Sequence, residues 1–300
     1  MPVSQPPILV FPGMGNECVG MSAGWQDQLE WAATVVAAEQ HSGQPLRRWM
    51  QEGPESKLRA QRHAPNATMA HSVGVYRSHR AAGLPLPAAA SGHSLGFFSA
   101  IVSAGVVPLE AVLDLVLNCE DLADAEFGQG SMGMAFLIGM PEAEVREAVA
   151  GRTDVVLSNL NGKANFSLSG EARALAALVE ELAPRCLKAG MLPVQQPLHG
   201  PHMAPLLPAL SRRLAAIRPA EPDFPLICML DGRKITSGAE AWSEAIASVA
   251  LAVDWPKVVT ALGGFEGEWY ECGFGTQLTR LTRWLARDRI VGSLQQPPSK

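Results

Sequence analysis

Short apolar runs alternate with helical patterns along the first part of the chain. Residues 8–11 and 86–90 are apolar, and each run leads into a glycine-containing loop, which is typical of buried strands. Helical patterns cover residues 19–39, 46–51, 67–82, 97–107 and 108–125. This alternation of strands and helices predicts an α/β fold.

Beyond residue 127 the predicted elements become shorter. Strands are predicted at 134–138, 155–160, 165–168 and 186–191, and helices at 142–150 and 171–182. The order strand, helix, two strands, helix, strand is the ferredoxin-like arrangement. We therefore predict a small ferredoxin-like subdomain over residues 128–198, inserted into a large α/β-hydrolase-like subdomain formed by residues 1–127 and 199–300.

The last third of the chain returns to the large subdomain. Helices are predicted to about residue 217 and at 241–251, 255–262 and 276–287, and strands at 226–230 and 268–272. A loop rich in proline and glycine, residues 197–202, makes the connection.

Composition narrows the class of protein. Apolar residues form 47% and charged residues 18% of the chain, which indicates a globular protein. The net charge of -5 and the lack of basic runs longer than a pair argue against nucleic-acid binding. No apolar run approaches the roughly 20 residues of a membrane helix, and the first residues lack a signal-peptide pattern. We therefore expect a cytoplasmic protein, a monomer, with no membrane partner.

The cysteines do not suggest a disulfide framework or a metal site. There are 5, an odd number, and they are widely spaced without a Cys-x-x-Cys pair. Free cysteines without disulfide bonds are typical of proteins in a reducing compartment. We expect no bound metal.

Candidate chemistry begins at Gly92-His93-Ser94-Leu95-Gly96. This stretch follows an apolar run and precedes a helical one, as in a nucleophile elbow that presents a serine hydroxyl where a strand turns into a helix. Glycines two residues to each side of Ser94 permit a tight backbone. A chance match is the alternative, because Gly-x-Ser-x-Gly is a short pattern. Ser94 is the candidate nucleophile.

A serine nucleophile needs a base, and the 7 histidines are the candidates. His93 adjoins Ser94 and is expected to point away from it at a sharp turn. His199 and His202 lie in the Pro- and Gly-rich loop at the predicted subdomain junction. These loop histidines are the better candidates for the base.

Several motifs in order along the chain resemble those of malonyl-CoA:acyl-carrier-protein transacylases and polyketide-synthase acyltransferases. They are Phe11-Pro12-Gly13-Met14-Gly15, Val19-Gly20-Met21, Gly92-His93-Ser94-Leu95-Gly96, Asn159-Leu160-Asn161, Ser169-Gly170, Pro193-Val194 with His199, Val253-Asp254-Trp255 and Gly273-Phe274-Gly275. The resemblance spans nearly the whole chain. It is more specific than any one motif, because the order and the spacing both agree.

The resemblance implies a ping-pong mechanism. Ser94 would take an acyl group from an acyl thioester substrate, and His199 would act as general base and then general acid. The main-chain N–H groups of Met14 and Leu95 would form the oxyanion hole, and the main-chain carbonyl of Leu251 would orient His199. The phosphopantetheine thiol of an acyl carrier protein would resolve the acyl-enzyme, so that no cofactor is bound by the enzyme itself.

The departures from the family pattern concern the acyl pocket. Cys119 stands where malonyl-using members of the family carry an arginine that pairs with the substrate carboxylate. Phe97 replaces a glutamate, Met14 a glutamine, and Leu198 a phenylalanine or serine. With Asn161, we assign Phe97, Cys119 and Leu198 to the acyl pocket. An acyl group without a free carboxylate fits such a pocket better than malonyl.

The alternative is that Phe97 and Leu198 are ordinary core residues, and that Arg152 or Arg185 replaces the missing arginine. The sequence also leaves three functions open. The first is a discrete, trans-acting acyltransferase of polyketide or related secondary metabolism. The second is an acyl hydrolase that removes stalled acyl groups from carrier proteins, and the third is a catalytically silent carrier-protein-binding subunit. Ser94→Ala separates the two enzymes from the silent subunit.

Overall fold

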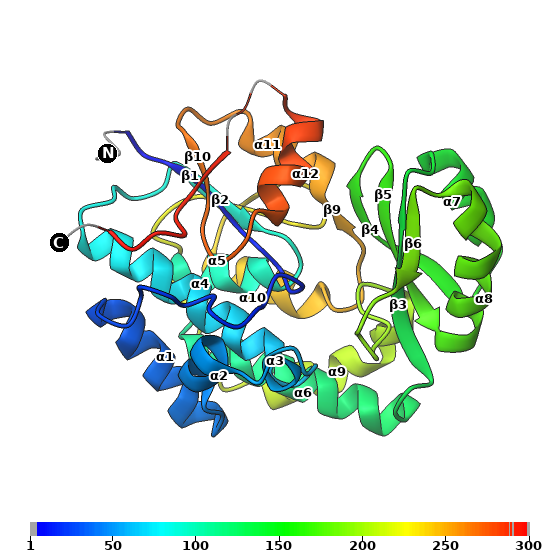
Figure 1. Cartoon of the computed structure of the whole chain (residues 1–300), viewed down its shortest axis with the longest axis horizontal. Helices are drawn as coiled ribbons and strands as arrows, with labels where there is room; N and C mark the ends of the chain where they lie inside the picture. Colours follow the sequence, from blue (N-terminus) through cyan, green and yellow to red (C-terminus); the bar gives the residue numbers. More distant parts are fainter. Residues whose placement is uncertain (1–4, 288, 290, 299–300) are drawn as a thin grey trace.

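The larger of two sheets forms the centre of the molecule. The computed structural model describes residues 5–287, 289 and 291–298 (Figure 1). The larger sheet has 6 strands in the order β11-β10-β1-β2-β7-β8. Their bounds are β1 Ile8–Phe11, β2 Ala89–Gly92, β7 Leu226–Ile227, β8 Lys234–Ile235, β10 Trp269–Glu271 and β11 Val291–Ser293. All neighbours are parallel except β7 and β8, which are antiparallel.

Helices surround this sheet. They are α1 Leu29–Ser42, α2 Leu46–Glu52, α3 Glu55–Leu58, α4 Ala64–Ala81, α5 Leu95–Ser103, α6 Leu109–Phe127, α9 Leu207–Arg213, α10 Gly238–Ala247, α11 Trp255–Leu262 and α12 Gln277–Leu285, with 3-10 turns at Ala183–Arg185 and Pro201–Leu206. Every residue of α5 is buried, so its apolar composition reflects a position inside the core. The predicted α/β class is confirmed.

The small sheet lies at one end of the molecule with α7 Glu142–Val149 and α8 Ala172–Leu182 (Figure 1). Its antiparallel strands β3 Met132–Ile138, β4 Val155–Gly162, β5 Asn165–Glu171 and β6 Lys188–Met191 pair in the order β6-β3-β5-β4. This is the ferredoxin-like arrangement that the sequence predicts. The sheet has a buried cluster of its own, between Ala135 and Leu182. On that basis we propose residues 128–198 as the inserted subdomain.

A strand from the large subdomain extends the small sheet. β9, Val253–Asp254, pairs in parallel with Asn159 and Leu160 of β4. The sequence does not predict this strand, nor β8 and β11, because strands of two or three residues show no periodicity. The pairing joins the two subdomains through main-chain hydrogen bonds.

Some predicted boundaries are wrong, and glycine or proline explains each. The helix predicted at 19–39 begins only at Leu29, because Gly20 and Gly24 have positive φ angles of 89° and 81° and the chain turns there. The strand predicted at 86–90 begins at Ala89, beyond Pro87. The helix predicted to residue 217 is a 3-10 turn followed by the short α9.

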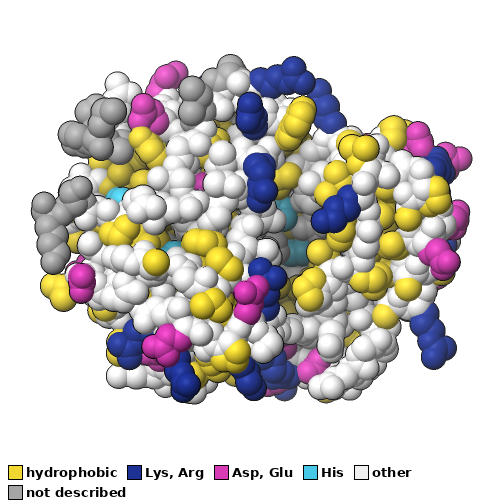
Figure 2. Space-filling model, viewed as in Figure 1, with side chains coloured by type: hydrophobic (Ala, Val, Ile, Leu, Met, Phe, Trp, Pro, Cys, Tyr) yellow, Lys and Arg dark blue, Asp and Glu magenta, His cyan; other side chains and the backbone are white. Residues whose placement is uncertain are grey.

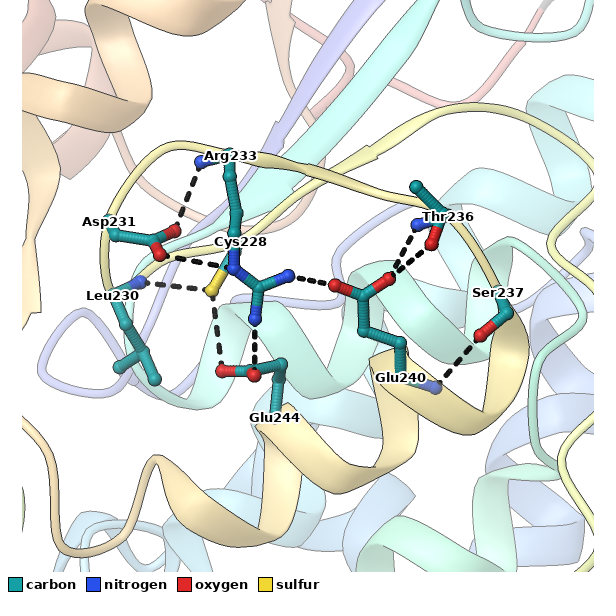
Figure 3. A network of polar contacts seen from close by, with 8 residues as sticks. All are labelled: Cys228, Leu230, Asp231, Arg233, Thr236, Ser237, Glu240 and Glu244. Atoms are coloured by element: carbon teal, nitrogen blue, oxygen red, sulfur yellow. Dashed lines mark hydrogen bonds and ion pairs between the residues drawn. The ribbon is translucent and has the colours of Figure 1, made fainter.

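An ionic network fixes α10 to the β7–β8 hairpin (Figure 3). The guanidinium of Arg233 pairs with the carboxylates of Glu240 and Glu244, both on α10. Ser237 accepts a hydrogen bond from the main-chain N–H of Glu240 at 3.2 Å and so caps the helix. Because α10 leads directly into Ser248, this network also places the carbonyl of Ser248.

Two glycines allow α5 to pass close to β1 and β2. A Cβ on Gly96 would lie 1.9 Å from the carbonyl oxygen of Phe11, and a Cβ on Gly92 would lie 2.0 Å from the carbonyl carbon of Gly96. Neither glycine has a positive φ. The elbow therefore requires glycine at these positions for close backbone approach, and the unusual backbone conformation falls on Ser94 instead.

We expect Gly96→Ala to destabilise the fold. The added methyl group would clash with main-chain atoms that cannot move alone, so the free energy of unfolding should fall by about 2 kcal/mol or more. Gly162→Ala is the matched control, because its Cβ would meet only a Leu285 methyl carbon at 3.9 Å. Denaturant unfolding of both variants measures the effect. Equal stability of the two variants would contradict the close approach.

Candidate active site

Ser94 lies at the turn between β2 and α5 in a rare backbone conformation. Its φ is 52° and its ψ is -120°. Among the non-glycine residues that the structure describes, only Ser94 and His199, with φ of 60°, have positive φ. Such backbone strain persists only where the surrounding structure holds it, and it is concentrated at functional sites.

Ser94 and His199 meet directly. The Oγ atom of Ser94 lies 2.7 Å from Nε2 of His199. The other ring nitrogen, Nδ1, lies 2.7 Å from the carbonyl oxygen of Ser248, and the main-chain N–H of His199 donates to Val249 at 2.8 Å. A carbonyl only accepts hydrogen bonds, so Nδ1 carries the proton. Nε2 is therefore free to accept the proton of the Ser94 hydroxyl.

Burial keeps this imidazole neutral. His199 is buried, and desolvation lowers its pKa to about 4, with a further lowering from the nearby His93. The carbonyl of Ser248 opposes the shift, and the main chain of Leu251 opposes it more weakly. Leu251 is the residue that the resemblance indicates as the orienting carbonyl, but the hydrogen bond at Nδ1 goes to Ser248.

Met14 and Leu95 are the residues that the resemblance indicates for the oxyanion hole. Both line the same cavity as Ser94 and His199. Leu95 is the first residue of α5, so its N–H has no acceptor within the helix. Within the described part of the chain, the N–H groups of Met14 and Leu95 donate to no other main-chain carbonyl. Both donors are thus available to a ligand beside Ser94.

The cavity beside Ser94 has a volume of about 60 Å³. Cys119 and Leu198 line it, as the sequence analysis expects. Most of the other lining residues are apolar, among them Phe98, Leu115, Val116 and Val194, while Gln61, Glu120 and Gln196 are polar. The cavity therefore suits a short acyl group.

The structure does not place Phe97 and Asn161 in this cavity. Phe97 is fully buried in the large core, and Phe98, one residue further along α5, lines the cavity instead. Successive helical residues point about 100° apart, and the sequence alone does not show which of the two faces the site. Asn161 accepts a hydrogen bond from His93 through its Oδ1 atom at 2.6 Å.

His93 thereby links the elbow to the small sheet. Its ring also makes an edge contact with Trp255, with ring centroids 5.7 Å apart. The His93 ring contacts Asn161 and Trp255 rather than Ser94, in keeping with the expectation from the sharp turn. His202, the other loop histidine, lies 2.7 Å from the carbonyl oxygen of Thr153 and is not part of the site.

Neither arginine that was considered as a substitute lies in the cavity. Arg152 pairs with Asp154 through two hydrogen bonds of 3.0 and 2.9 Å, and Arg185 pairs with Glu144. No arginine or lysine lines the cavity among the residues that the structure describes. The alternative that Arg152 or Arg185 supplies the missing positive charge is therefore wrong.

Sequence reasoning missed Ser248, Phe98 and Glu120. Ser248 acts through its main chain, which no side-chain pattern reveals. Glu120 directly follows Cys119, but it stands beside Asp121 in an acidic stretch, which by its sequence looks like an exposed helix face. In the described ranges no helix is long and apolar enough to cross a membrane, and no group of His, Cys, Asp or Glu is arranged to hold a metal ion.

Comparison with known proteins shows the family of the chain. Residues 8–252 match the acyl transferase domain family. The malonyl CoA-acyl carrier protein transacylase of Salmonella typhimurium is 30% identical, over 96% of this chain and 95% of the relative. The mycoketide-CoA synthase of Mycobacterium tuberculosis is 29% identical, over 86% of this chain and 6% of that much longer protein.

Solved structures show the same fold. The malonyl-CoA:acyl carrier protein transacylase of Xanthomonas oryzae has a TM-score of 0.89 and 29% identity, over 98% of this chain and 96% of that chain. A malonyl-transacylase solved with its type II polyketide acyl-carrier protein has a TM-score of 0.88 and 27% identity, over 97% and 96%. The chain therefore belongs to the acyl transferase domain family. It is an acyltransferase, as the sequence predicts.

We expect the reactivity of Ser94 to persist into acid. Since the pKa of His199 is lowered to about 4, its neutral form, which accepts the serine proton, is lost only as the pH falls through that value. The rate at which a fluorophosphonate labels Ser94 should therefore reach half its neutral-pH value near pH 4.

Circular dichroism at each pH would show that the fold persists. His202→Ala should label like the parent protein, while His199→Ala should label far more slowly. Half-maximal labelling near 6.5, the ordinary pKa of histidine, would contradict the effect of burial.

Proposed function

We propose that this protein transfers an acyl group without a free carboxylate between thioesters, through an acyl-enzyme on Ser94. The observation that carries the proposal is the 2.7 Å contact between Ser94 Oγ and His199 Nε2, with Nδ1 held by Ser248. This contact gives the serine a base in the correct tautomer. It also weighs against a catalytically silent binding subunit.

The first half-reaction acylates Ser94. His199 Nε2 accepts the hydroxyl proton as Oγ attacks the thioester carbonyl, and the N–H groups of Met14 and Leu95 stabilise the oxyanion. The carbon–sulfur bond then breaks, and His199 returns the proton to the leaving thiolate. In the second half-reaction the acceptor thiol gives its proton to His199 and attacks the acyl carbonyl, so that a new carbon–sulfur bond forms. The bond from the acyl carbon to Ser94 Oγ then breaks, and His199 returns the proton to Oγ.

The acceptor in our proposal is the phosphopantetheine thiol of an acyl carrier protein. Support comes from the related malonyl-transacylase that was solved in complex with such a protein. The relatives include a mycoketide-CoA synthase, so we place the reaction in polyketide or related secondary metabolism, with the chain acting as a discrete enzyme.

The chemistry of the cavity supports an acyl group without a carboxylate. Burial raises the pKa of the Cys119 thiol to about 12, so this side chain is neutral and provides no counter-charge. Its neighbour Glu120 faces the same cavity and carries a potential negative charge. A malonyl carboxylate would lose its hydration there and gain no cation in return.

We expect acetyl or longer uncharged thioesters to acylate Ser94 faster than malonyl thioester. Intact-protein mass spectrometry after mixing with a panel of acyl thioesters measures the adducts. Ser94→Ala should give none, because the nucleophile is lost. Malonyl loading as efficient as acetyl loading would contradict the proposed acyl preference.

A chase then separates the transferase from the hydrolase. Adducts that persist in water and move to phosphopantetheinylated carrier protein support the transferase. Adducts that disappear in water as quickly as with the carrier protein would identify an acyl hydrolase, in which water replaces the acceptor thiol.

A further inference from the structure

Glu120 is a buried carboxyl group that the mechanism above does not use. It follows Cys119 on α6, is 7% exposed, and lines the cavity that also contains Ser94 and His199. Across the described ranges, the Glu120 carboxyl group makes no side-chain hydrogen bond and no close ion pair. A buried carboxyl group without a partner is unfavourable for folding. Such a group at a ligand cavity indicates a partner on the ligand.

The nearest guanidinium is already engaged. Arg62 donates to Asp121 and to Asp124, each at 2.8 Å. The charge of Arg62 acts on Glu120 only at longer range and lowers its pKa. Burial has the larger, opposite effect, and together with Asp124 and Asp121 it raises the pKa of Glu120 to about 7. Two carboxylates thus share one cation, and Glu120 is left facing the cavity.

The other polar groups around the cavity do not satisfy this carboxyl group. The amide nitrogen of Gln196 points to Asp124 at 3.5 Å, and the amide oxygen of Gln61 accepts the main-chain N–H of Gln195. The Cys119 thiol is a weak hydrogen-bond donor. A carboxylate in a small, mainly apolar cavity binds a ligand N–H or O–H group more strongly than it would in water, because the local dielectric constant is lower.

We propose that Glu120 selects short acyl groups that carry an amine or hydroxyl group, which donates a hydrogen bond to the Glu120 carboxyl group while the acyl carbonyl lies at Ser94. This inference rests on the proposed acyl-enzyme at Ser94. Under the proposed function alone, the cavity only excludes an acyl group, namely malonyl. Under this inference, the cavity also favours a particular polar group on the acyl chain. Glu120 is thus a specificity-determining residue of the acyl site.

A matched set of thioesters tests the proposal. Butyryl, 3-hydroxybutyryl and 3-aminobutyryl thioesters have the same chain length and differ only in the donor group. We expect at least one donor-bearing substrate to acylate Ser94 with a kcat/KM about tenfold or more above that of butyryl. A preference for the amine alone would indicate an ion pair with Glu120. A preference for both the amine and the hydroxyl would indicate a hydrogen bond that either group can donate.

Two variants locate the preference. Glu120→Gln should lower the ratio of 3-aminobutyryl to butyryl loading, because the neutral amide cannot form an ion pair with the ammonium group. Glu126→Gln makes the same change at an exposed position of the same helix, and it should leave all three rates unchanged. The melting temperature of each variant reports on folding. The ratio in the parent protein tests the proposal even if Glu120→Gln folds poorly.

The pH dependence gives a second readout. Glu120 is protonated below its pKa of about 7, so a preference for the ammonium form of 3-aminobutyryl should increase as the pH rises through that value. Butyryl loading with no preference for either donor would overturn this inference and leave the acyltransferase proposal standing. No acylation of Ser94 by any thioester would overturn both.

Discussion

The contact between Ser94 and His199 depends on backbone geometry that most sequences cannot adopt. Both residues hold a positive φ, and each is held there by its neighbours. On the serine side, the close approach of β1, β2 and α5 leaves no space for a side chain at Gly92 or Gly96. On the histidine side, hydrogen bonds to Ser248 and Val249 fix both the ring and the main chain. The pair is therefore preorganised before any substrate binds.

This preorganisation draws on both sheets. The ion-pair network of Arg233 fixes α10, which precedes Ser248, while His93 joins the elbow to Asn161 of β4. The β9–β4 pairing adds main-chain hydrogen bonds between the same subdomains. The small subdomain is thus structurally coupled to the nucleophile. A change at the interface between the subdomains would reach the active site through a short chain of direct contacts.

Electrostatics divides the site into two parts with different tasks. Around Ser94 and His199, burial keeps the imidazole neutral and ready to take a proton. Around Cys119 and Glu120, burial disfavours the charged forms of the thiol and the carboxyl group. The same physical effect, the loss of hydration, therefore favours the neutral imidazole at one end of the cavity and underlies the acyl selection that we propose at the other.

The order of the longer elements, the elbow serine and the family were all readable from the sequence, because they depend on local patterns and on motif order. The ferredoxin-like order of β3 to β6, for example, follows from periodicity alone. Tertiary structure decided what depends on long-range contact: the acceptor at His199 Nδ1, the choice of Phe98 over Phe97, and the unpaired state of Glu120. Adjacent residues in a helix look alike in sequence, and only packing determines which one faces a cavity and which one is buried in the core.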